Sequence, residues 1–102
     1  MITVCICGDE RQMDDPDEQW INQEISRRRR AGQSIWVLVR LEGDGVSVAL
    51  CTKNCPRNGW AYRPPTSKER GVLELWHSMG LNNGAMNPGT LIAFLKRSRQ
   101  MI

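Results

Sequence analysis

Four cysteines form two close pairs, Cys5-x-Cys7 near the N-terminus and Cys51-x₃-Cys55 in the middle of the chain. Four thiolates can surround a tetrahedral zinc ion with Zn–S distances of about 2.3 Å. Zinc knuckles commonly place two residues between paired cysteines, whereas Cys5 and Cys7 on one strand share a face about 6.5 Å apart. Two interpretations therefore stay open: a structural zinc site, or small buried thiols of the core.

A second candidate set is basic and aromatic. Arginines neutralise phosphates, and aromatic rings stack on bases for about 1–3 kcal/mol per base, which is how proteins bind single-stranded nucleic acid. Helix-turn-helix and RNP-like motifs do not fit the sequence. The alternative is a set of solvated charges that satisfy the terminal carbonyls of helices. The candidate residues for binding nucleic acid or an acidic protein are Arg27, Arg28, Arg29, Arg30, Arg57, Trp60, Tyr62, Arg63, Lys96, Arg97 and Arg99.

Patterns typical of catalysis are weak. His77 is the only histidine, and Cys55 lies in a loop without a nucleophile-elbow motif. The acidic pairs Asp14-Asp15 and Asp17-Glu18 lie at an expected helix start, where carboxylates cap the helix and complement its dipole. The segment Gly43-Asp44-Gly45 lacks the helix that follows a phosphate-binding loop. We therefore expect a protein that is not an enzyme, with no cofactor unless zinc is bound.

The N-terminal third of the chain predicts a strand and then a helix. Residues 2–7 alternate between two faces as a strand does, and residues 8–14 read as an acidic loop. Asp15 and Pro16 match the N-cap and first position of a helix that continues to about Ala31. Gly32 provides the left-handed position that ends it.

The remaining chain predicts a hairpin and two helices. Residues 35–41 and 46–51 are rich in β-branched side chains around a Gly-containing turn, and residues 60–62 could add a short strand. Thr66 with Glu69 forms a capping-box pattern for a helix that stops at Gly80, and Asn87 with Pro88 starts the last helix. The order is β-α-β-β-(β)-α-α. This predicts one α+β domain over residues 1–102, with a three- to four-stranded, mostly antiparallel sheet and about three helices.

Composition limits the classes of protein. The chain has 102 residues, 40% hydrophobic and 25% charged, which is typical of a globular domain rather than a disordered chain. Its apolar runs are too short for a membrane-spanning helix, and the N-terminus lacks a signal-peptide pattern, so we expect a cytoplasmic protein with no membrane partner. Four cysteines without export are more often reduced thiols or metal ligands than disulfides.

Charge is divided unevenly along the chain. The net charge of +3 combines an acidic segment, residues 1–24, with a basic remainder. This division would either steer an anionic partner to one side or let the two segments pair internally. We expect a non-catalytic binding or regulatory domain whose basic surface meets nucleic acid or an acidic protein. The alternative is a zinc-stabilised structural domain that forms oligomers through exposed apolar residues such as Trp36 or Trp60.

Overall fold

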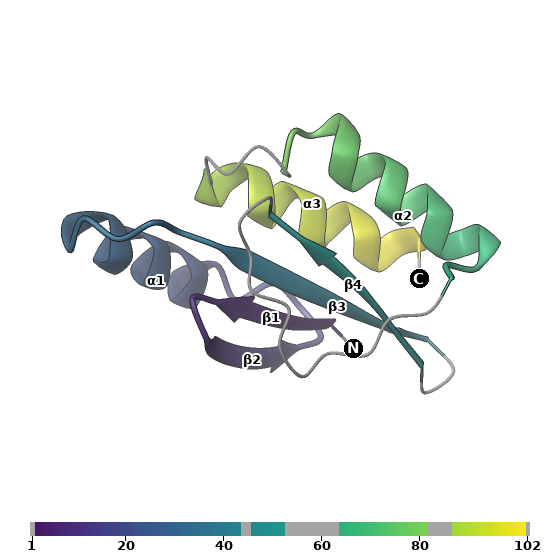
Figure 1. Ribbon diagram of the computed structural model, residues 1–102. Coiled ribbons are helices and arrows are strands. Elements are labelled where there is room, and N and C mark those ends of the chain that lie inside the picture. Colours follow the sequence, from purple (N-terminus) through teal and green to yellow (C-terminus); the bar gives the residue numbers. More distant parts are fainter. Residues whose placement is uncertain (1, 44–45, 53–63, 82–86, 102) are drawn as a thin grey trace.

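The computed structural model describes residues 2–43, 46–52, 64–81 and 87–101. It confirms an α+β fold with a four-stranded antiparallel sheet and three helices (Figure 1). None of the helices described is long and apolar enough to cross a membrane. In chain order the elements are β1 (Ile2–Ile6), β2 (Asp9–Met13), α1 (Glu18–Arg30), β3 (Val37–Gly43), β4 (Val46–Cys51), α2 (Ser67–Ser78) and α3 (Pro88–Met101).

The sheet has the strand order β2-β1-β3-β4, and every neighbouring pair is antiparallel. Val4 of β1 lies opposite Arg11 of β2 on one side and Val39 of β3 on the other. Val39 in turn lies opposite Leu50 of β4. The apolar strands β1 and β3 are therefore central, and the polar strand β2 forms an edge.

One face of the sheet carries the main core. All three helices contribute buried side chains to the cluster on this face. Between α2 and α3, the rings of Trp76 and Phe94 meet edge to face with centroids 5.0 Å apart, a preferred geometry for aromatic pairs. The strands supply Val4, Ile6 and Val39 to the same cluster, all fully buried. The core therefore lies between this face of the sheet and the three helices.

The other face of the sheet carries a second, smaller cluster. Cys5 and Leu38 are buried there, and the half-buried Trp36, Ala49 and Cys51 pack against them. Both faces of β1 and β3 are therefore apolar, which explains why the first arm of the predicted hairpin shows no alternation.

The acidic loop expected over residues 8–14 is wrong, because residues 9–13 form the edge strand β2. The turn between β1 and β2 is only Cys7 and Gly8, with φ of 50° and 97°, as a two-residue hairpin of type I′ requires. Pairing with β1 overrides the low strand propensity of this segment, whose polar side chains protect an edge from pairing with other chains. The element order is therefore β-β-α-β-β-α-α, and the short strand expected at residues 60–62 lies outside the described residues.

The helix ends follow local chemistry with one correction. The N-cap of α1 is Asp17 rather than Asp15, because the Asp17 side chain accepts a hydrogen bond from the Trp20 amide at 3.1 Å. The capping box of Thr66 and Glu69 is confirmed at α2. At α3 the Asn87 side chain accepts a hydrogen bond from the Gly89 amide, as expected of a capping residue.

Candidate functional site

The C-terminal end of α1 carries four consecutive arginines, Arg27 to Arg30. The last carbonyls of this helix are satisfied by backbone amides and not by the arginine side chains. Gly32 adopts a φ of 71°, and its amide donates to the carbonyl of Arg29 while the Gln33 amide donates to that of Arg28. This is the Schellman arrangement, in which backbone amides satisfy the last carbonyls of a helix. The guanidinium groups are therefore not needed to satisfy these carbonyls.

Two of the four arginines are held by the protein's own carboxylates. Arg27 pairs with Glu24 at 2.6 Å and with Asp9 at 3.3 Å. The partner that Arg28 contacts most closely is Asp9, and Glu24 lies 3.7 Å away. The hydrogen bond with Glu24 raises the pKa of Arg27 above its ordinary value, so this group stays charged. Asp9 on the edge strand β2 and Glu24 on α1 therefore pair with the same two guanidinium groups.

The other two arginines of this end differ in environment. Arg29 and Arg30 are exposed, and neither forms an ion pair with another part of the chain that the structure describes. Both belong to the last turn of α1. This end of the helix lies at the end of the molecule where the chain continues toward β3 (Figure 1). Two adjacent cations are therefore open to an external anion at this place.

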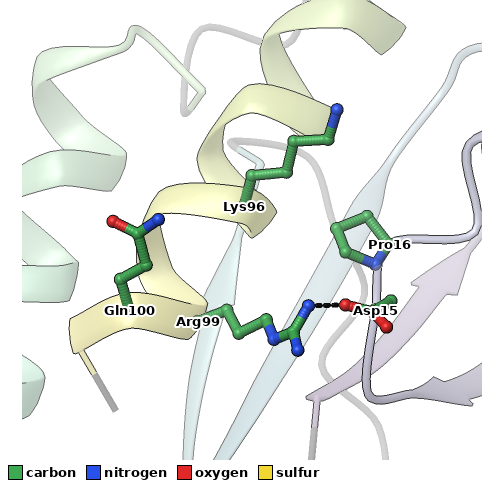
Figure 2. Close-up of a pocket in the computed structure, with 5 residues that line it drawn as sticks. All are labelled: Asp15, Pro16, Lys96, Arg99 and Gln100. Atoms are coloured by element: carbon green, nitrogen blue, oxygen red, sulfur yellow. Dashed lines mark ion pairs between the residues drawn. The ribbon is translucent and has the colours of Figure 1, made fainter.

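Two of the basic residues of α3 are neutralised by acidic residues at and just before the start of α1. Lys96 pairs with Glu18 at 2.5 Å, and Arg99 pairs with Asp15. Figure 2 shows Arg99 reaching across to Asp15, while Lys96 projects from the preceding turn beside Pro16. Together with Gln100 these residues line an open depression of about 670 Å³. Its cations are already paired, so it is not an uncompensated site for an anion.

The remaining basic candidate on α3 is Arg97. It is exposed, and no ion pair to it occurs within the described ranges. Lys68 and Arg70 of α2 have the same character although they were not among the predicted site residues. The N-terminal end of α2 and the C-terminal end of α3 lie together, away from the C-terminal end of α1 (Figure 1). Those of the predicted basic residues that the structure describes therefore do not converge on one surface.

The cysteines that the structure describes fall on two sides of the sheet. Cys5 and Cys51 belong to the smaller cluster, separated by Leu38, which lies opposite each of them in the sheet. Cys7 packs against the main core instead. Its left-handed backbone breaks the strand alternation, so the expectation that Cys5 and Cys7 share a face is wrong.

Metal binding is not favoured by the described geometry. No three His, Cys, Asp or Glu side chains gather around one point in the part of the chain that the structure describes. Burial raises the pKa of the Cys5 thiol, which disfavours the thiolate that zinc needs. Cys55 lies outside the described residues, so the four-cysteine zinc site stays a prediction.

Four of the predicted binding residues also lie outside the described residues, namely Arg57, Trp60, Tyr62 and Arg63. The sequence analysis did not identify the acidic partners of Arg27, Arg28, Lys96 and Arg99. The pairing of Glu24 with Arg27 and Arg28 could have been found from the i,i+3 and i,i+4 spacing. The contact from Asp9 could not have been found in this way, because it depends on strand β2. The acidic residues of that segment had indicated a loop.

Comparison with protein-family models, with curated proteins and with solved structures finds no match for this chain.

Proposed function

We propose that the chain is a non-catalytic binding domain for an acidic partner, and that this partner is nucleic acid held by its phosphates at Arg29 and Arg30. The observation that carries the proposal is the division within one helix end. Arg27 and Arg28 are paired internally, whereas Arg29 and Arg30 are exposed without ion pairs in the described ranges. Because Gly32 closes the helix backbone, these two guanidinium groups serve no capping role that the geometry requires.

Nucleic acid is favoured over an acidic protein by charge density. Exposed arginines gain little from a single carboxylate, since surface ion pairs contribute about 0–1 kcal/mol. A nucleic-acid backbone presents a dense line of phosphates, and each contact releases condensed counterions. Two such contacts predict weak binding that does not depend on base sequence.

The α1 end is also favoured over the other exposed cations. Arg29 and Arg30 are adjacent in the sequence, and no acidic residue follows them before the next strand. Lys68 and Arg70, in contrast, flank Glu69 in the first turn of α2. Arg97 stands alone as an exposed cation without an ion pair among the residues described on α3.

The test is fluorescence anisotropy with a labelled oligothymidylate between ~50 and ~200 mM NaCl. Two contacts to a single strand predict a slope of log affinity against log salt of about −1.4, a loss of about sevenfold over this range. The variant Arg29→Gln/Arg30→Gln should lose this binding. The matched control, Lys68→Gln/Arg70→Gln, changes the net charge equally on another helix and should retain it.

An equal loss in both double variants would contradict the proposal, because it would show diffuse attraction to the whole molecule. Wild-type protein that does not bind the oligonucleotide at ~50 mM salt would also contradict it. Polyglutamate is the second ligand in the same assay. Binding of polyglutamate alone, with the same dependence on Arg29 and Arg30, would identify an acidic protein as the partner instead.

A further inference from the structure

Asp9 occupies a special place between the sheet and the arginine-rich end of α1. It is the first residue of β2, directly after the two-residue turn of Cys7 and Gly8. This turn places Asp9 opposite Ile6 at the end of the β1–β2 hairpin. From there one carboxylate oxygen of Asp9 contacts Nη2 of both Arg27 and Arg28, residues that lie 18 and 19 positions further along the chain.

The contact resembles the one that a phosphate would make. Carboxylate and phosphate oxygens accept hydrogen bonds from the same guanidinium donors. Arg27 and Arg30 are neighbours on the helix surface, because they lie three residues apart in α1. An extended strand of phosphates bound at the exposed pair therefore passes close to the paired arginines. Asp9 therefore takes a position for which a phosphate of the partner would compete.

We infer that Asp9 makes an autoinhibitory contact, which withholds Arg28 from the nucleic acid bound at Arg29 and Arg30. This inference rests on the proposed function. Arg28 is the arginine affected most, because its closest partner is Asp9 and its distance to Glu24 is 3.7 Å. Arg27 keeps Glu24 at 2.6 Å when Asp9 is neutralised.

The contact is exchangeable rather than structural. The side chain of Asp9 is 52% exposed, so water and salt compete for its charge as they do in other surface ion pairs. The backbone of β2 is held independently by its pairing with β1. Neutralising Asp9 should therefore release Arg28 without unfolding the hairpin.

The experiment compares Asp9→Asn with wild-type protein in the oligothymidylate assay. One released arginine should add one phosphate contact and make the salt slope steeper by about 0.7, which is about 2.6-fold more salt dependence over a fourfold change in salt. Glu74→Gln is the matched control, since Glu74 is exposed on α2 and has no ion pair among the described residues. It removes the same charge and should leave the slope unchanged.

A third variant, Asp9→Asn/Arg28→Gln, should return the slope to the wild-type value. If wild-type protein binds but Asp9→Asn and Glu74→Gln give the same slope, the autoinhibitory contact is refuted and the proposed function stands. If neither wild-type protein nor Asp9→Asn binds the oligonucleotide, both fall. Circular dichroism melting of each variant confirms that the fold is retained.

Discussion

At the residue scale, the turn at Cys7 decides which side of the sheet two cysteines face. Among the described residues, Cys7 is the only residue other than glycine with a positive φ. An L-residue in the left-handed region costs about 1–2 kcal/mol, with Asn the tolerated exception. The Cys7 thiol contacts the carbonyls of Ser34 and Trp36 at 3.6 and 3.8 Å, but a thiol is a weak donor and offsets little of this cost. The pairing of β1 with β2 compensates for this backbone cost, and the same hairpin sets the register of β2 and the position of Asp9.

Cys7→Asn should stabilise the protein by about 0.5–1 kcal/mol, because Asn followed by Gly is the preferred pair for a type I′ turn. The free energy of unfolding from urea titration measures this. Cys7→Ala is the control, since it removes the thiol but keeps the unfavourable backbone. An Asn variant no more stable than the Ala variant would show that the turn carries no strain of this kind.

At the element scale, helix boundaries were predictable where one local signal stands alone. Thr66 with Glu69, and Asn87 with Pro88, each mark a single start, and both are confirmed. The start of α1 was misplaced by two residues because several acids compete for the cap. Asp17 takes that role with its bond to the Trp20 amide, and it also pairs with Arg11 at 2.5 Å. Because Arg11 lies on β2, its contact with the capping residue Asp17 cannot be identified from the sequence around the helix start.

Thr66→Ala should destabilise the protein by about 1 kcal/mol, because the Thr66 hydroxyl accepts the bond from the Glu69 amide in the capping box. Ser67→Ala removes an equivalent hydroxyl from the exposed first turn without removing the cap, so it should change the stability by less than about 0.5 kcal/mol. Thermal melting of the two variants compares them. Equal losses of stability would show that the capping box contributes nothing specific.

At the scale of the whole molecule, folding pairs much of the acidic N-terminal segment with basic residues of α1 and α3. The acidic N-terminal segment contacts α1 through Asp9 and α3 through Asp15 and Glu18. Sequence reasoning foresaw internal pairing as one of two outcomes but could not locate the pairs, because they depend on how α3 packs beside α1. The fold class followed from hydrophobic periodicity, which is local. Which described cations form no ion pair depends on tertiary contacts. Hydrophobic periodicity carries no information about these contacts.

Under the proposed function, the anionic partner meets the C-terminal end of α1 and not the basic residues of α2 and α3. The most direct measurement is a ¹⁵N–¹H correlation spectrum of the full chain titrated with oligothymidylate at ~50 mM salt. We expect the largest amide shifts at residues 27–34 and at Asp9, with small shifts at residues 67–71 and 96–101. Shifts concentrated at the α2 and α3 residues, or spread evenly over all basic residues, would contradict binding at the C-terminal end of α1.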